Sequence, residues 1–378
     1  MKTRGILAVL FVAVMVIPVT GALFSDDSTA AEEDFSYYYR DQLTTNQRII
    51  YNAFSDADPS ALIAHGDATY AVAVTVPSTY VLSSSSVDTL TEVLLADMAR
   101  AWQATMLDNP LAWWTWSTDN AGEALFSNSF TAPGTSVAGF TFYVRIADAY
   151  AAGGSTLSER ISAVTSEFNT LMSSGTISGD DDLAKIRSAN KYLCSDNFVY
   201  DADYSYSGSV YGALVKNPDG KYHIACMGFS KLFKMVCDYY HIDCLATVGN
   251  AAQGETIDGH MWNTVRLTID GQRKVLGADI TFNATGPTKE DYLLDGYATL
   301  ADNRAFSQTH QAFAPIVDSP ALWVDFNFIS PDLDKDGYTY PAESDILTKL
   351  IEFMPWILIG AICAILAFVL WSMGRRGD

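Results

Sequence analysis

The sequence has little positive charge: 23 Lys and Arg stand against 44 Asp and Glu, which gives a net charge of -21 over 378 residues. No block of Lys or Arg stands out that would grip a phosphate backbone, so nucleic acid is not an expected partner. Away from its two ends the chain also lacks any stretch long and apolar enough to cross a bilayer. This lack excludes a transporter or receptor with several spans.

Cysteine is scarce, with five residues in the whole chain, so a small disulfide-dense scaffold is excluded. Cys194, Cys237 and Cys244 each sit among apolar neighbours, and we expect them to be buried thiols. A disulfide between Cys237 and Cys244 is the main alternative. A zinc site is a weaker alternative because the spacing of its candidate ligands fits no common zinc template; those candidates are His223, Cys226, Cys237, Cys244 and His260.

The long apolar runs that do occur lie at the two ends of the chain. Residues 1–22 have the layout of a secretory signal peptide or an N-terminal anchor, with basic residues ahead of an apolar run. Residues 353–373 are long enough to span a bilayer, and residues 374–378 form a basic tail. Because positive flanks face the cytoplasm, we expect a single-pass cell-membrane protein whose bulk is extracytoplasmic.

The region that follows the first apolar run, residues 32–178, mixes helix-like and strand-like stretches. Apolar residues at steps of three or four predict a helix from Val87 to Trp102, and β-rich runs predict strands at 69–76 and 138–146. Trp113, Trp114 and Trp116 form an aromatic cluster, for which core packing is the first interpretation and a substrate platform the second.

A stretch rich in Gly, Ser and Asp at 174–182 indicates a domain boundary or a long loop. The second region, residues 179–320, is expected to fold as helices followed by an antiparallel sheet, which makes the class α+β. The predicted helices cover about 182–194 and begin again near Cys226, and the predicted strands lie near 243–249, 261–269 and 272–281. Residues 321–347 read as an acidic stalk.

Cys226 differs from the other cysteines because a loop-like stretch precedes it and helical apolar spacing follows it. It is therefore expected to open a helix, where unpaired backbone N–H groups and the helix dipole lower the pKa of a thiol. The same N–H groups can hold an oxyanion. Cys226 is the candidate nucleophile of the chain.

A thiolate nucleophile needs a proton shuttle, and His260 is the best placed of the five histidines. If Asp270 and Gly271 make a two-residue hairpin turn, Trp262 faces Asp279 across the hairpin and His260 is its diagonal neighbour. His260 and Asp279 then share one face of the sheet. A carboxylate in that position can orient the imidazole and stabilise the imidazolium.

Five blocks around these residues follow in order: YGALV at 211–215, CMGFSKLF at 226–233, HIDCLATVG at 241–249, GHMWNTV at 259–265 and ADITFN at 278–283. With them the chain resembles the transglutaminase-like superfamily over about residues 190–285. Its members, like papain-like enzymes, use a cysteine at a helix start, a histidine on one strand and an aspartate on the next. The N-terminal pieces FSYYYRDQLTTNQRIIYNAF and LDNPLAWWTWS resemble the less specific segment that precedes this domain in some exported members.

The resemblance implies a role for each residue: Cys226 as nucleophile, His260 as general base and Asp279 as orienting acid. Tyr211 is either an oxyanion donor or a packed aromatic. The implied activity is acyl transfer on peptide or glutamine amide bonds of a protein or peptide substrate, by hydrolysis or amine crosslinking, with no cofactor for catalysis. A non-catalytic adhesion or envelope-binding module on the same fold is the alternative.

Two departures from the family pattern affect the expected pocket lining rather than the triad. Met227 and Phe229 stand where members usually have a glutamate and a tyrosine. Residues 274–276 replace the usual aromatic pair before the final strand. The resemblance therefore predicts the chemistry but not the substrate preference.

Residues 332–343, DLDKDGYTYPAE, match the template of a calcium-binding loop. Its predicted ligands are Asp332, Asp334, Asp336, Tyr338 through its carbonyl, and Glu343. A structural Ca²⁺ at this site would stiffen the link between the catalytic region and the membrane. The alternative is an acidic stalk without an ion.

Overall fold

The computed structural model describes residues 35–115, 125–126, 132–151, 156–254, 256–313, 327–341 and Met354. The predicted signal segment, the membrane span apart from Met354, the basic tail, Trp116 and Glu343 therefore lie outside the described residues. Within the described part, no helix combines the length and the apolar character that crossing a membrane requires.

The N-terminal region is a three-stranded antiparallel sheet in the order β1-β2-β3, against which helices pack. Its elements are η1 (Phe35–Tyr37), α1 (Tyr38–Asp41), α2 (Thr45–Ser55), β1 (Ile63–His65), β2 (Ala68–Ser83), α3 (Val87–Asp108), η2 (Pro110–Thr115), β3 (Ser136–Arg145), α4 (Asp148–Ala151) and α5 (Leu157–Ser173). The expected helix and both expected strands are present, and β2 pairs with β3. The apolar stripe of α3 is buried, as are Trp113 and Trp114.

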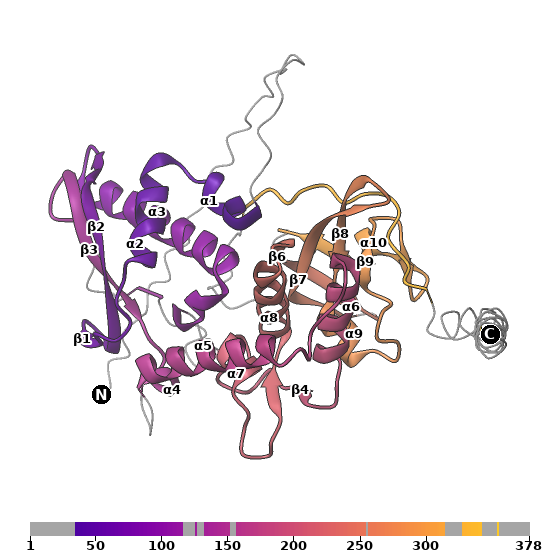
Figure 1. Ribbon diagram of the computed structural model, residues 1–378. Coiled ribbons are helices and arrows are strands. Elements are labelled where there is room, and N and C mark those ends of the chain that lie inside the picture. Colours follow the sequence, from indigo (N-terminus) through magenta and orange to yellow (C-terminus); the bar gives the residue numbers. More distant parts are fainter. Residues whose placement is uncertain are drawn as a thin grey trace, which may run out of the picture. The chain divides into compact units, whose positions relative to one another are not determined.

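The second region is a five-stranded antiparallel sheet in the order β12-β6-β7-β8-β9, with helix α8 packed against β6 and β7 (Figure 1). Its elements are α6 (Asp182–Leu193), β4 (Phe198–Tyr200), α7 (Val210–Leu214), β5 (Tyr222–Ile224), α8 (Cys226–Tyr239), β6 (Asp243–Gln253), β7 (Thr256–Ile269), β8 (Gln272–Ala278), α9 (Ile280–Thr285), β9 (Leu293–Asp295), β10 (Leu300–Ala301), β11 (Arg304–Ala305), α10 (Phe306–Thr309) and β12 (His310–Ala312). This mixture of helices and antiparallel strands confirms the α+β class.

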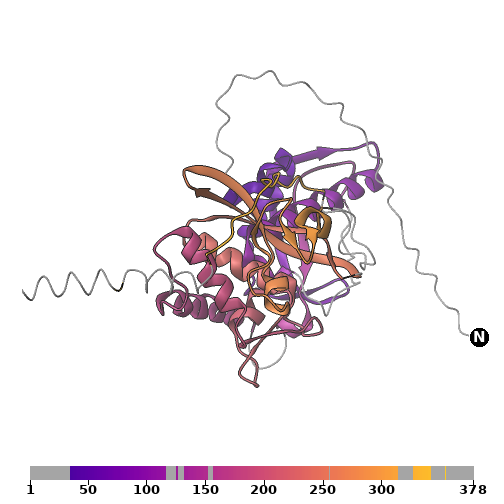
Figure 2. The same cartoon turned by 90° about the vertical axis from the view of Figure 1, so that its right-hand side faces the viewer.

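The hairpin of β7 and β8 has the predicted register. Asp270 and Gly271 both have positive φ angles, 52° and 76°, as a tight two-residue turn requires. Ile269 consequently pairs with Gln272, and Asn263 pairs with Ala278. β7 also pairs with β6, and the turns of the two hairpins lie at opposite ends of β7 (Figure 2). One expectation was wrong: β8 ends at Ala278 rather than near 281, because the Asp279 side chain accepts a hydrogen bond from Phe282 N and caps α9.

Helix α8 begins at Cys226, as expected, and its residues from Met227 to Cys237 are all buried. Gly228 in its first turn allows a close approach of the chain before it. A Cβ atom at this position would lie 2.6 Å from the carbonyl oxygen of Ser207. The glycine therefore lets the start of the helix sit against the 207–225 segment.

Candidate active site

Cys226 is half-buried at the first position of α8. The residue before it, Ala225, has no side chain that accepts hydrogen bonds from the first-turn amides. Burial would raise the pKa of this thiol, but the hydrogen bond and the charge of His260, with a backbone hydrogen bond from Met261, lower the pKa below its ordinary value. The site thus favours a thiolate at Cys226.

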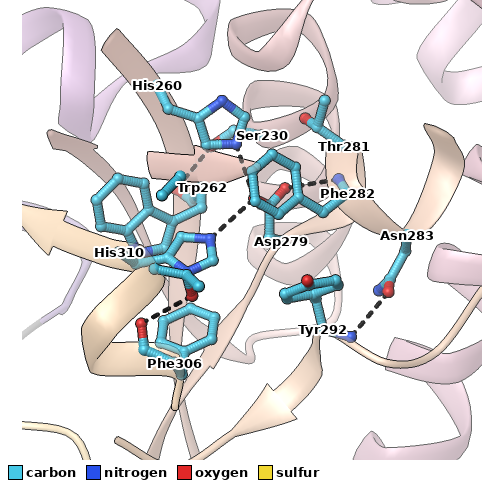
Figure 3. Close-up of polar contacts among 12 residues, drawn as sticks. Ser230, His260, Trp262, Asp279, Thr281, Phe282, Asn283, Tyr292, Phe306 and His310 are labelled. Atoms are coloured by element: carbon cyan, nitrogen blue, oxygen red, sulfur yellow. Dashed lines mark hydrogen bonds and ion pairs between the residues drawn. The ribbon is translucent and has the colours of Figure 1, made fainter. Parts of the chain in front are cut away.

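His260 lies on β7 and points its Nε2 atom at the Asp279 carboxylate, 2.7 Å from Oδ2 (Figure 3). Burial opposes the charged imidazole, but the Asp279 charge and hydrogen bond, followed by those of Cys226, raise the pKa of His260 above its ordinary value. Because Nε2 is engaged with Asp279, the other ring nitrogen, Nδ1, is the one left for the Cys226 sulfur.

Asp279 sits between β8 and α9 and is fully buried. Its Oδ1 atom accepts from Phe282 N at 3.0 Å, while Oδ2 faces His260. Burial would raise the pKa of this carboxyl, but the charge and hydrogen bond of His260 hold the pKa well below its usual range. Asp279 is therefore ionised across the neutral pH range.

A second imidazole contacts the same oxygen. His310 on β12 places Nε2 3.0 Å from Asp279 Oδ2 and is itself buried. Sequence reasoning missed this residue, because β12 comes 31 residues after Asp279 and joins the sheet only by pairing with β6. No motif around His310 indicates that neighbour.

Side chains between α8 and the sheet fix the thiol relative to the imidazole. Ser230 Oγ donates to the Trp262 carbonyl at 3.0 Å, and Asn263 Nδ2 donates to the Ser230 carbonyl at 3.1 Å. The same amide donates to Leu245 O on β6 at 3.2 Å. These buried bonds join the helix that begins at Cys226 to the strand that carries His260.

Tyr211 lies on α7 among other aromatic side chains. Its ring stacks on Trp113 at 5.7 Å and contacts Tyr206 at 4.8 Å between ring centroids. These contacts support the packed-aromatic interpretation, and the oxyanion role stays a prediction.

Tyr200 is a tyrosine near the thiol that sequence reasoning did not single out. It lies on β4, which pairs in parallel with β5, the strand that leads into Cys226. Burial first, and then the charges of Cys226, Asp258 and Asp279, raise the pKa of Tyr200 to about 12. Its side chain nevertheless remains half exposed beside the site.

The other cysteines that the structure describes are free thiols. Cys237 and Cys244 are buried, and burial, followed by the hydrogen bond to Cys244, raises the pKa of Cys237. The alternative of a Cys237–Cys244 disulfide was therefore wrong. His223, a candidate for the zinc alternative, is instead held between Asp201 and Asp219 at 2.8 Å each.

Among the described residues, His260, Asp279 and His310 bring their possible ligand atoms within 4.8 Å of one another, close enough for a metal ion to bridge, but they already hydrogen-bond to each other through Asp279 Oδ2. The predicted calcium ligands form no such group in that part of the chain, and Glu343 lies outside it. Asp334 Oδ2 accepts from Val275 N at 2.7 Å, which ties the loop to β8. The calcium site stays a prediction.

A cavity of about 830 Å³ is lined by residues that include Asp108 at the end of α3 and Lys234 and Tyr239 in the C-terminal half of α8. None of Cys226, His260, Asp279 or His310 lines it. We therefore place the candidate chemistry at Cys226, His260 and Asp279 and not in this cavity.

Comparison with known proteins adds little to this geometry. No family model matches the chain, and no curated protein does. A solved structure of a TGase is similar over 43% of this chain and 45% of its own, at 15% identity and a TM-score of 0.28. The matched part spans less than half of that chain, and a likeness at this level carries no argument.

Proposed function

We propose that the chain is a cysteine-dependent acyl-transfer enzyme of transglutaminase-like type that acts on amide bonds of a protein or peptide substrate. The observation that carries this proposal is the buried contact of 2.7 Å between His260 Nε2 and Asp279 Oδ2, beside a thiol at the start of a helix. This combination supplies an activated nucleophile, a proton carrier and an orienting acid.

In the proposed reaction, the Cys226 thiolate attacks the amide carbonyl carbon and forms a carbon–sulfur bond. The N–H groups at the start of α8 stabilise the oxyanion, with Tyr211 as a candidate further donor. His260 gives the proton on Nδ1 to the departing nitrogen as the carbon–nitrogen bond breaks. A thioester and an amine result. Water in a hydrolase, or a lysine or another amine in a crosslinker, then attacks the thioester carbonyl carbon. The carbon–sulfur bond breaks, the Cys226 thiolate leaves, and His260 takes up the proton of the attacking group.

The sequence supports a setting for this activity at the cell surface. The apolar run near the N-terminus and the C-terminal run at 353–373 would place the bulk of the chain outside a membrane that it crosses once. A protein or peptide at that surface is the proposed substrate.

Selective labelling of one thiol tests the proposal. In the full-length chain, Cys226 should react with iodoacetamide at neutral pH far faster than Cys194, because burial raises the pKa of Cys194 to about 12. A Cys226→Ala variant should lose the fast label, and the matched Cys194→Ala variant should keep it. If the two variants react alike, the thiol is not activated and the non-catalytic binding module becomes the better account.

The same chain, incubated with a peptide library, identifies the bond and the acceptor. Shortened peptides without added amine indicate hydrolysis, and amine-linked products indicate crosslinking. Both products should be absent in Cys226→Ala. Products that persist in that variant would come from a different site.

We also propose that the loop 332–343 binds Ca²⁺. The tie between Asp334 and Val275, with the bond from Tyr338 N to Leu294 O at 2.9 Å, holds part of this loop against β8 and β9. Added Ca²⁺ should slow proteolysis within 327–347 in the native chain but not in a Glu343→Gln variant. Equal protection of the two proteins would contradict the calcium site and favour the alternative, an acidic stalk that binds no ion.

A further inference from the structure

His310 is placed to control the carboxylate on which His260 depends. Asp279 Oδ2 faces two imidazoles at once, His260 Nε2 at 2.7 Å and His310 Nε2 at 3.0 Å (Figure 3). Both the carboxylate and His310 are inaccessible to water, with side chains 0% and 1% exposed. Water therefore cannot replace the His310 bond at this oxygen.

The position of His310 is fixed from several sides. Its ring stacks on Phe306, with 3.9 Å between the ring centroids and 6° between the planes. Gly277 on β8 makes room for Phe306, since a Cβ atom there would lie 2.5 Å from the Phe306 ring. His310 also pairs with Ala251 on the neighbouring strand β6. The imidazole thus cannot turn away from Asp279 without moving the sheet edge.

The hydrogen-bond pattern assigns the protons of the two rings. An ionised carboxylate only accepts, so both Nε2 atoms carry a hydrogen. Burial lowers the pKa of His310, which keeps this ring neutral and leaves its Nδ1 atom as an acceptor. Thr309 Oγ1 lies 2.9 Å from that Nδ1, and its single hydrogen has a second acceptor in the Phe306 carbonyl oxygen, 3.1 Å away. The carboxylate therefore selects the tautomer of His310 that donates from Nε2.

We propose that His310 is a positioning residue for the proposed acyl transfer: it holds Asp279 Oδ2 in place and ionised, so that Asp279 in turn holds His260. This inference rests on the proposed function. His310 touches neither the thiol nor the substrate in this scheme, and acts through the carboxylate alone.

Loss of the His310 donor has two consequences for the pair of Cys226 and His260. The carboxylate keeps one bond on each oxygen, from Phe282 N and from His260, and is free to turn into the vacated side. The pKa of Asp279 also rises, because one donor to its charged form is gone. Both changes destabilise the charged form of His260. The Cys226 thiolate, which that charge stabilises, therefore forms only at higher pH.

Other ionisable groups face this cluster and remain unchanged in the proposed variants. The centroid of the Tyr292 ring lies 6.1 Å from that of the His310 ring, and the centroid of the His260 ring lies 6.3 Å from it. Cys194 and Tyr200 interact electrostatically with Asp279. A shift seen when only His310 is altered therefore reports the His310 bond.

Two substitutions at one position test the proposal in the full-length chain. His310→Phe keeps a ring to stack on Phe306 but removes the donor, whereas His310→Gln keeps an N–H donor. We expect His310→Phe to lower kcat/KM by about 10- to 100-fold, the effect of losing one hydrogen bond to a charged group. The loss should fall on kcat rather than KM, and His310→Gln should recover most of it. His241→Asn, an exposed histidine outside this site, is the matched control and should behave as the native chain does.

The pH dependence of Cys226 alkylation gives a readout that needs no substrate. The acid limb of this profile is the pH range over which the alkylation rate rises. In His310→Phe the acid limb should move to higher pH, and in His310→Gln it should return toward the native position. If His310→Phe does not fold, Thr309→Val keeps the imidazole but removes the hydroxyl that lies 2.9 Å from its Nδ1 atom, and should shift the limb in the same direction. All assays contain a chelator, since His260, Asp279 and His310 can together hold a metal ion.

The outcomes separate this inference from the proposed function. A native chain whose Cys226 is unreactive and which cleaves or links no peptide would overturn the function itself. A reactive Cys226 with unchanged kcat and an unchanged alkylation profile in His310→Phe, or in Thr309→Val where the first variant does not fold, would overturn only the role of His310.

Discussion

Cys226, His260 and Asp279 share the candidate site with His310, so the protonation state of each depends on the others. The pKa of His260 is raised, so its charge persists at neutral pH and is lost as pH rises through that raised value. The pKa of Cys226 is lowered, so its thiolate persists until pH falls through that lowered value. A thiolate and an imidazolium therefore coexist between these two limits.

This coexistence predicts a plateau in thiol reactivity. The alkylation rate of Cys226 should level off at a lower pH than that of an ordinary thiol, which gains about tenfold per pH unit below its pKa of about 8.5. An Asp279→Asn variant should abolish the plateau, because His260 then loses the charge that raises its pKa. The measurement is the rate of iodoacetamide labelling against pH, with Cys226→Ala as the background. A native rate that rises tenfold per unit would contradict the coexistence.

The sequence predicted the helix start at Cys226 and the closeness of His260 to Asp279, because a helix start and the parity of a hairpin are local properties. It did not identify His310 or Tyr200. Their contact with the site depends on β12 pairing with β6 and on β4 pairing with β5, each across an intervening segment. A single sequence holds no periodic signal for such distant pairings.

Asp295 offers a second prediction at this scale, outside the site. Its Oδ2 atom is buried without a hydrogen-bond partner, and burial followed by the charge of Asp291 raises its pKa to about 7. A raised carboxyl pKa favours the folded state below the unfolded value of about 3.9, and this contribution is lost as pH rises toward 7. Asp295→Asn should therefore stabilise the fold at pH 8 more than at pH 5, by at most about 3 kcal/mol.

Urea unfolding at the two pH values measures this difference. Asp180→Asn, at an exposed aspartate in the loop before α6, is the control and should show little pH-dependent change. Equal stabilisation by Asp295→Asn at both pH values would mean that the native carboxyl is not protonated near neutrality.

At the scale of elements, the start of α8 depends on the absence of a side chain at Gly228. A methyl group there would lie 2.6 Å from the Ser207 carbonyl and 2.8 Å from the Ile224 Cβ atom. Gly228→Ala should therefore destabilise the fold by about 1–3 kcal/mol. It should also slow Cys226 alkylation, since the helix start must move. Gly134→Ala, where no atom lies within 4 Å, is the matched control. A Gly228→Ala variant with native stability and native reactivity would show that the segment around Ser207 and Ile224 can move without a loss of stability.

The elements also show where local pattern stops determining structure. The register of β7 and β8 follows from a two-residue turn, so it was predictable from Asp270 and Gly271 alone. The end of β8 was predicted too late in the sequence, because Asp279 caps α9 through Oδ1 and contacts the histidines through Oδ2. A residue with two structural roles interrupts the alternation on which a strand prediction rests.

For the molecule as a whole, the hydrophobic core is continuous across the boundary predicted near residue 179. One cluster of buried side chains includes Tyr39 and Trp113 on one side and Phe229 and Cys244 on the other. Tyr39 also donates from its hydroxyl to the Ala246 carbonyl on β6 at 2.7 Å. The composition of the 174–182 loop predicts a break in the chain, but composition carries no information on whether two regions share a core.

The described part of the predicted stalk joins the folded part in a similar way. Phe328 is buried against the Tyr39 ring at 5.1 Å between centroids, and Ile329 N donates to Gln42 Oε1 at 2.8 Å. Tyr340 donates from its hydroxyl to the Leu183 carbonyl at 2.7 Å. Acidic composition alone indicated an extended link, whereas the aromatic residues within it supply the apolar contacts that attach it.

A shared core predicts that the two regions unfold together. Trp113 is buried, stacks on Tyr211 and meets Tyr150 edge to face, so Trp113→Ala should cost about 3–5 kcal/mol. Hydrogen exchange of α3 amides reports the N-terminal region, and labelling of the buried Cys237 thiol reports the second. With one cooperative core, both probes should give a single urea midpoint, and the variant should lower both midpoints equally. A variant that lowers the α3 midpoint and leaves Cys237 protected would show that residues near 179 separate two independently stable units.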